Sequence, residues 1–190
     1  MAKRAFIVHG WDGYPEEGWF PWMKRELEQR DFVVAVLSMP DPAVPTIDAW
    51  VGHLAQIVGE PDEQTYFLGH SIGCQAILRY VASISGRKIG GIVLVAGFLE
   101  LKKLETDEEE TIARPWLTTP IDFKQVQQAT RNITVILSDN DAWVPLARNT
   151  ALFKQHLNPR IIVEHEKGHY SGSDGITELP AARDAVVQDN

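Results

Sequence analysis

The sequence contains a single cysteine, Cys74, which excludes an internal disulfide and a zinc site built from several cysteines. Basic residues are also in the minority, because 18 Lys and Arg against 26 Asp and Glu leave a net charge of −8. Nucleic acids and anionic membranes select for basic surfaces, so we expect neither as a partner. These absences favour a soluble protein of the reducing cytoplasm that carries no metal and no cofactor.

The N-terminus also lacks a long hydrophobic run, because the apolar stretch at residues 5–9 is too short for a signal peptide or a membrane span. The sequence shows no internal repeat, and its prolines and glycines are scattered rather than gathered in a linker. A chain of 190 residues is long enough for one domain with a substantial core. We therefore expect a single domain over residues 1–190.

Short apolar runs alternate with helical patterns along the chain. Predicted strands occupy residues 5–9, 32–37, the run that begins at Thr65, 88–96, 133–137 and 160–165. Helical patterns cover residues 17–30, 123–131, 144–157 and 176–187, and two more begin at Thr46 and after Ser71. The polar stretch at residues 100–123 has no clear pattern and is a candidate for a small lid. This alternation predicts an α/β fold, with three α/β/α layers and a mostly parallel sheet of about six strands.

A Gly-x-Ser-x-Gly motif at residues 69–73 separates a predicted strand from a predicted helix. If Ser71 lies on a sharp turn between them, its hydroxyl is exposed, and Gly69 and Gly73 avoid collisions with neighbouring elements. The alternative is an ordinary serine N-cap at the start of a crossover helix. A serine hydroxyl is a weak nucleophile, so catalysis also requires a base and an orienting acid.

The base is expected among six histidines. Five of them lie in helical patterns or at strand ends, namely His9, His53, His70, His156 and His165. His169 is better placed, because it follows Gly168 in the loop beyond the last predicted strand. Since ligand sites of such sheets lie beyond the carboxyl ends of the strands, this loop can return an imidazole over the sheet.

Two aspartates after the fifth predicted strand are candidates for the acid that orients the histidine. Asp139 is closer to the strand and could brace the turn instead. Asp141 precedes the start of the next helix, from which its side chain can point across the site. We therefore favour Asp141 and keep Asp139 as the alternative.

An oxyanion intermediate needs backbone N–H donors, typically worth about 3 kcal/mol each in the reaction barrier. The amide of Ile72 follows the nucleophile directly, and the loop at residues 9–11 can supply a second donor, for which we choose the amide of Trp11. The aromatic side chains of Trp11, Trp143 and Tyr170 are candidates for the wall of an apolar substrate pocket. They could equally be ordinary packing residues.

Four segments together resemble the α/β-hydrolase superfamily, whose triad runs Ser, Asp, His along the chain: residues 8–10, 69–73, 138–145 and 168–169. The short length and the Met-Pro-Asp-Pro segment at residues 39–42 are similar to the small serine hydrolases related to retinoblastoma-binding protein 9 and bacterial YdeN-like proteins. The resemblance implies a trimmed hydrolase fold and a triad of Ser71, Asp141 and His169. A Leu-x-Cys-x-Glu pattern cannot occur around the only cysteine, so no retinoblastoma-protein partner is implied.

We therefore predict a cytoplasmic serine hydrolase, of the carboxylesterase type, that acts on a small ester, thioester or amide through an acyl-enzyme. One alternative is a binding module that keeps the hydrolase scaffold without turnover and contacts a partner protein. Another is a cysteine-based reaction at Cys74, near the start of the same helix, although a packed thiol is expected there.

Overall fold

The computed structural model describes residues 2–187, which form a six-stranded sheet flanked by seven α-helices. The strands are β1 (Lys3–Val8), β2 (Phe32–Leu37), β3 (Thr65–His70), β4 (Gly91–Val95), β5 (Ile133–Ser138) and β6 (Arg160–Glu164). The helices are α1 (Phe20–Glu28), α2 (Ile47–Val58), α3 (Ile72–Ser83), α4 (Asp107–Thr118), α5 (Phe123–Ala129), α6 (Leu146–His156) and α7 (Pro180–Val187). A short 3-10 helix, η1 (Gly172–Asp174), precedes α7.

All neighbouring strands pair in parallel, in the order β2-β1-β3-β4-β5-β6. The predicted α/β class with a largely parallel sheet is therefore confirmed. The chain first moves from β1 outward to β2 and then returns to β3 on the other side of β1. The carboxyl ends of β1 and β3 thus flank the point where the strand order reverses, which is the usual ligand site of such sheets.

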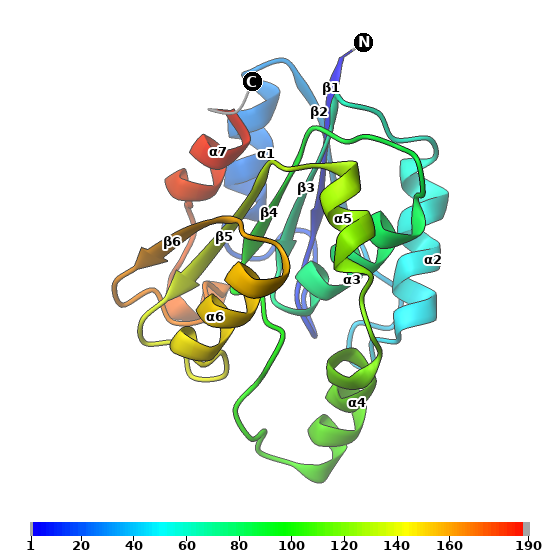
Figure 1. The fold of residues 1–190 in the computed structure, drawn as a ribbon. Coiled ribbons are helices and arrows are strands. Elements are labelled where there is room, and N and C mark those ends of the chain that lie inside the picture. The colour runs from blue at the N-terminus through cyan, green and yellow to red at the C-terminus, as the bar shows by residue number, and fades with distance from the viewer. Residues whose placement is uncertain (1, 188–190) are drawn as a thin grey trace.

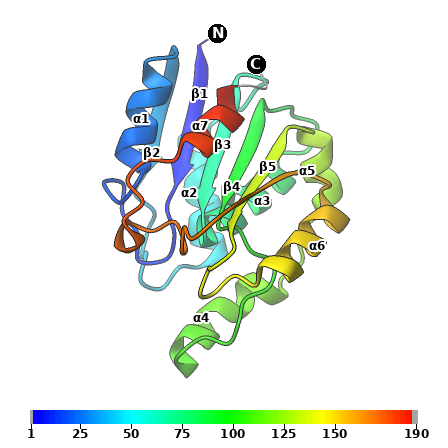
Figure 2. The ribbon, with the colours of Figure 1, turned by 90° about the vertical axis from the view of Figure 1, so that its left-hand side faces the viewer.

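The helices form one layer on each face of the sheet (Figure 1, Figure 2). Helices α1 and α7 pack on one face, and α2, α3, α5 and α6 pack on the other. The strands are apolar on both sides because alternate residues enter different layers. Ile7 of β1 faces α1 and α7, whereas Phe6 faces the layer that contains α3. Burial on both faces explains why the strand sequences show continuous apolar runs.

Several helices begin later than the sequence patterns predict. Helix α1 begins at Phe20 with a proline in its first turn, and α6 begins at Leu146, just after Pro145. Helix α7 begins at Pro180 rather than at residue 176. Proline lacks an N–H group and fits the first turn of a helix, so the prolines mark these starts more closely than the apolar periodicity does.

The unassigned stretch at residues 100–123 contains helix α4, which lies beyond the carboxyl ends of the strands (Figure 1). Thr106 and Glu109 form a capping box at its start. Its end is fixed by Arg79 of α3, whose guanidinium donates hydrogen bonds to the carbonyls of Trp116 (2.8 Å) and Thr119 (2.9 Å). Among the described residues, no helix is long and apolar enough to cross a membrane.

Candidate active site

Ser71 connects β3 to α3 with a positive φ of 52° and a ψ of −122°, which is a strained conformation for a residue with a side chain. The turn is close to its neighbours, because a Cβ added at Gly73 would lie 2.5 Å from the carbonyl oxygen of His9. Ser71 occupies the N-cap position of α3, but its side chain makes no capping hydrogen bond there. The hydroxyl is therefore not used as a helix cap and points to another partner.

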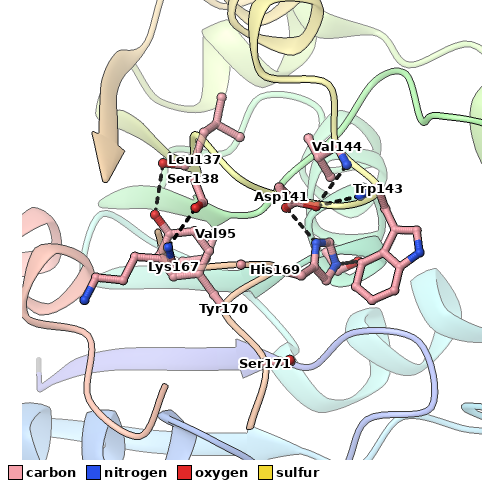
Figure 3. A network of polar contacts seen from close by, with 12 residues as sticks. Val95, Leu137, Ser138, Asp141, Trp143, Val144, Lys167, His169, Tyr170 and Ser171 are labelled. Atoms are coloured by element: carbon pink, nitrogen blue, oxygen red, sulfur yellow. Dashed lines mark hydrogen bonds and ion pairs between the residues drawn. The ribbon is translucent and has the colours of Figure 1, made fainter. Parts of the chain in front are cut away.

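That partner is His169, whose Nε2 lies 2.8 Å from the Oγ of Ser71. On its other side, the Nδ1–H of His169 donates to Oδ2 of Asp141 at 2.8 Å (Figure 3). The imidazole is 11% exposed and the Asp141 side chain 2% exposed, so solvent screens this pair weakly. The structure thus brings Ser71, His169 and Asp141 into one hydrogen-bonded chain.

Asp141 is held in place by the start of the next segment (Figure 3). Its Oδ1 accepts hydrogen bonds from the amides of Trp143 (2.9 Å) and Val144 (3.0 Å). Its backbone carbonyl accepts a hydrogen bond from the ammonium of Lys102 at 2.7 Å. One carboxylate oxygen is used to fix the loop, which leaves the other oxygen directed at His169.

Asp139 has a different environment. Its Oδ2 accepts a hydrogen bond from Nδ1 of His165 at 2.6 Å, and its Oδ1 accepts one from the amide of Glu166 at 2.9 Å. These contacts, the Glu166 amide first, lower the pKa of the Asp139 carboxyl. The His165 side chain is 78% exposed, so Asp139 braces the β5 and β6 loops at the surface and does not reach His169.

His9 and His156 have structural surroundings. His9 is buried, donates from Nδ1 to the carbonyl of Gly10 (2.7 Å) and accepts at Nε2 from the amide of Met39 (3.1 Å). Burial lowers the pKa of His9 and keeps the ring neutral. His156 stacks on Phe123 within the helical layer, at 4.5 Å between ring centroids. These contacts use His9 and His156 in packing rather than in proton transfer to Ser71.

The expected oxyanion donors lie next to Ser71. No hydrogen bond joins the amide of Trp11 or Ile72 to another residue in the range 2–187. Gly10 lets the loop after β1 approach closely, since a Cβ there would lie 3.2 Å from the Cβ of Ser71. Neither amide is therefore used within the fold, and both residues line the cavity beside Ser71.

A cavity of about 570 Å³ opens beside Ser71 and His169. Its apolar lining comes mostly from the segment between β4 and the first half of α4: Phe98, Leu101, Leu104, Ile112 and Ala113. Trp11 and Trp143 also line it, as predicted. The α4 residues could not be predicted from the sequence, because a polar stretch with only a few apolar side chains does not reveal which of them face a site.

The prediction for Tyr170 is wrong, because this side chain does not line the cavity. Tyr170 is fully buried in the layer that contains α1 and α7, and its hydroxyl donates to the carbonyl of Leu137 at 3.0 Å. A positive φ of 59° turns its side chain away from that of the adjacent His169. Tyr170 is therefore a packing residue that anchors the loop.

Cys74 is also a packing residue. The thiol is buried, and its Sγ lies 3.4 Å from the carbonyl oxygen of Val95, to which it donates. Burial raises the pKa of this thiol, so the reactive thiolate form is disfavoured. The structure thus contradicts the alternative of a cysteine-based reaction.

The family described as serine hydrolase matches residues 5–188 of the chain. The chain belongs to this serine hydrolase family. A relative of this serine hydrolase, YdeN of Bacillus subtilis (strain 168), is 32% identical over 189 residues, covering 98% of this chain and 96% of YdeN. The rat serine hydrolase RBBP9 is 22% identical over 174 residues, with 90% and 89% covered.

Solved structures agree with this assignment. The crystal structure of the ydeN gene product from B. subtilis superposes on the serine hydrolase with a TM-score of 0.89 at 28% identity, covering 98% of each chain. Est1E from Butyrivibrio proteoclasticus has a TM-score of 0.74 at 18% identity, covering 99% of this chain and 88% of Est1E, which is a likeness of fold. Another structure of Est1E has ferulic acid bound.

Proposed function

We propose that this serine hydrolase cleaves small carboxylic esters through an acyl-enzyme on Ser71. The observation that carries the proposal is the hydrogen-bonded chain from Ser71 through His169 to Asp141, placed at the wall of a cavity whose lining is partly apolar. In this reading Ser71 is the nucleophile, His169 the general base and acid, and Asp141 the residue that orients His169.

The geometry suits each proton transfer of such a reaction. Oγ of Ser71 attacks the ester carbonyl carbon while its proton passes to Nε2 of His169. The C–O bond to the leaving group then breaks, and His169 returns the proton to the departing oxygen. Water then attacks the carbonyl carbon of the acyl-enzyme while His169 takes a proton from it. His169 returns this proton to Oγ of Ser71 as the bond to the acyl group breaks, which releases the acid and free Ser71. The amides of Ile72 and Trp11 stabilise the negative oxygen in both steps.

Several features favour a simple ester over other acyl compounds. Part of the cavity lining is apolar, namely Phe98, Leu101, Leu104, Ile112 and Ala113, which suits an acyl chain or an apolar alcohol. No motif in the sequence marks a peptide groove. Ferulic acid, which is bound to Est1E, is a carboxylic acid, the class of product that the proposed reaction releases. Thioesters and amides are the alternatives within the same chemistry.

A fluorophosphonate probe tests the proposal directly, because it labels only an activated serine. We expect rapid labelling of the wild type at Ser71, no labelling of Ser71→Ala, and slow labelling of His169→Ala. Hydrolysis of p-nitrophenyl esters of increasing chain length then measures the acyl preference. A folded wild type that resists the probe, or ester turnover unaffected by His169→Ala, would instead favour a binding module on a hydrolase scaffold.

A further inference from the structure

The backbone of His169 is held by polar side chains at both its N–H and its carbonyl. The N–H donates to Oδ2 of Asp174 at 2.9 Å, and the carbonyl accepts a hydrogen bond from Nε2 of His70 at 2.7 Å. Asp174 belongs to η1 and His70 is the last residue of β3, so two separate elements bind the backbone of His169. Neither side chain takes part in the Ser71–His169–Asp141 chain.

His70 is suited to act as a permanent hydrogen-bond donor. It is 4% exposed and lies against the edges of the Trp19 and Phe20 rings, at 6.4 and 6.1 Å between centroids. Burial, and secondarily the neighbouring His169, lower the pKa of His70 to about 3. The ring therefore stays neutral at ordinary pH. Because Nε2 faces a carbonyl, Nε2 carries the proton.

The His70 side chain also contacts the loop that follows β1. His70 directly precedes Ser71, and a Cβ added at Gly10 would lie 2.9 Å from its Nδ1. The imidazole therefore touches the loop that holds the Trp11 amide as well as the backbone of His169. Any movement of His70 would be transmitted to both sides of the Ser71 hydroxyl.

Asp174 fixes the other side of the loop. In addition to the His169 amide, its Oδ2 accepts hydrogen bonds from the amide (3.0 Å) and the hydroxyl (2.6 Å) of Ser171. Burial raises the pKa of the Asp174 carboxyl, but the hydrogen bonds from Ser171 and His169 outweigh it and the net shift is downward. The carboxylate sits so close to Gly168 that a Cβ there would overlap it.

The loop needs such anchors because its backbone is strained. Gly168 and Tyr170, on either side of His169, both have a positive φ, of 57° and 59°. A non-glycine residue in this region is strained and persists only when its surroundings hold it. If the peptide units around His169 relaxed, Nε2 would leave its position 2.8 Å from the Ser71 hydroxyl.

We propose that His70 and Asp174 are positioning residues that clamp the backbone of His169 and so keep its imidazole aligned with Ser71. The inference rests on the proposed function, because alignment matters only if His169 transfers the proton. It assigns a role to the residue before the nucleophile, which the sequence motif leaves unspecified. It also makes η1, far from Ser71 in the chain, part of the support of the site.

The test compares variants that remove the hydrogen bond with variants that retain it. His70→Leu loses the donor, whereas His70→Gln offers an amide N–H at a similar reach. We expect His70→Leu to lower kcat about 100-fold with little change in KM, because misplacement of a catalytic group by about 1 Å costs this much. Fluorophosphonate labelling should slow in parallel, and His70→Gln should recover most of the rate.

The pH profile of kcat/KM separates positioning from loss of stability. With the clamp broken, the contact between His169 and Asp141 weakens, so the pH profile should differ from that of the wild type. The control is Leu54→Ala, a buried residue of α2 in the layer on the other face of the sheet, and it should lower the free energy of unfolding while leaving kcat and the pH profile unchanged. The Asp174 variants repeat the comparison on the other side of the loop. Asp174→Ala removes the acceptor of the His169 N–H, whereas Asp174→Asn keeps one oxygen acceptor.

The outcomes are distinguishable from those that test the proposed function. If the wild type is labelled at Ser71 but folded His70→Leu and Asp174→Ala keep its kcat and pH profile, the clamp is refuted while the hydrolase assignment stands. Equal losses in His70→Leu and His70→Gln would also refute it. If His70→Leu fails to fold, the Gln variant and the Asp174 pair carry the test. A wild type without labelling refutes the proposed function itself.

Discussion

Asp139 and Asp141 are two residues apart in one loop, yet their carboxylates have different neighbours. Asp141 is buried against His169, and Asp139 pairs with exposed His165. The sequence favours Asp141 through its place just before the next helix and through the resemblance to the hydrolases, and neither shows how the carboxylate is oriented. The hydrogen bonds from the Trp143 and Val144 amides are what aim the Asp141 carboxylate inward, and these depend on loop geometry.

Asp141→Asn and Asp139→Asn form a matched pair for measuring the role of the acid. An amide at 141 favours the wrong tautomer of His169 and cannot stabilise its charged form, so kcat should fall about 10⁴-fold. Asp139→Asn should change kcat by less than about threefold, because its ion pair with His165 lies at the surface and makes no contact with His169. Steady-state ester hydrolysis measures both, and a comparable loss in the two variants would contradict the assignment.

The buried neutral His70 also makes stability depend on pH. The pKa of His70 is about 3 in the folded protein and near 6.5 in the unfolded chain, so between these values only the unfolded chain binds the proton. His70 therefore does not lower the free energy of unfolding above about pH 6.5, and it lowers this free energy progressively as the pH falls toward 3. The slope of this decrease approaches about 1.4 kcal/mol per pH unit.

Urea unfolding at pH 7 and pH 5 measures this effect against His70→Gln, which has no titrating ring. We expect the wild type to lose about 2 kcal/mol more than the variant between these values. Carboxylates common to both proteins cancel in the comparison. An equal loss in the two proteins would mean that His70 titrates normally in the folded state.

At the scale of elements, the β3–α3 turn explains why glycine stands at position 73. A Cβ there would lie 2.5 Å from the carbonyl oxygen of His9 and 2.6 Å from that of Val8, both backbone atoms at the end of β1. Side chains can rotate away from such a contact, but a strand end cannot. The close approach brings the loop after β1, with the Trp11 amide, beside Ser71.

Gly73→Ala should therefore reduce both stability and activity. We expect a loss of about 3 kcal/mol or more in the free energy of unfolding, since overpacking against backbone costs at least that of a crowded core. Gly52 is the control, because it lies in α2 and a Cβ there meets no atom within 4 Å. Gly52→Ala should gain about 1 kcal/mol through helix propensity. Urea unfolding and ester hydrolysis measure both variants. Equal changes in stability and activity in Gly73→Ala and Gly52→Ala would contradict this explanation.

Helix α4 is an element that the sequence pattern does not predict. The capping box of Thr106 and Glu109 was available as a signal for its start. Pro115 and the polar composition obscured the rest of the helix. Its end is fixed by Arg79, some 40 positions earlier in the chain, and no local pattern reveals such a contact. That residues 100–123 act as a lid remains a prediction.

For the whole molecule, the fold class follows from the alternation of strands and helices, and Ser71, Asp141 and His169 could be chosen because each follows a strand. The order of the strands could not be derived, since several orders satisfy the same alternation. Tyr170 was misplaced because adjacency to His169 does not determine which face of the loop a side chain takes. His70 and Asp174 were missed as supports, because contacts to a backbone leave no sequence signature. The single domain and the cytoplasmic location remain predictions.

The charge of the molecule is also uneven around the cavity. Four carboxylates line it, namely Asp12, Glu17, Glu108 and Glu109, and no Lys or Arg in the described range does so. Glu109 is occupied by the capping box of α4, whereas the side chains of Glu17 and Glu108 form no hydrogen bond or ion pair within residues 2–187. Together with the net charge of −8, this lining creates a negative potential at the entrance.

Anionic esters should therefore be poor substrates compared with neutral esters of the same size. We expect kcat/KM for 4-nitrophenyl hemisuccinate to be about tenfold or more below that for 4-nitrophenyl pentanoate, because like charges within about 8 Å repel by about 2 kcal/mol at an effective dielectric constant near 20. Added salt should narrow the gap by raising the rate of the anionic ester alone. The Glu17→Gln/Glu108→Gln double variant should narrow it in the same way without changing the rate for the pentanoate. Equal rates for the two esters at low salt would show that the carboxylates do not govern entry to the cavity.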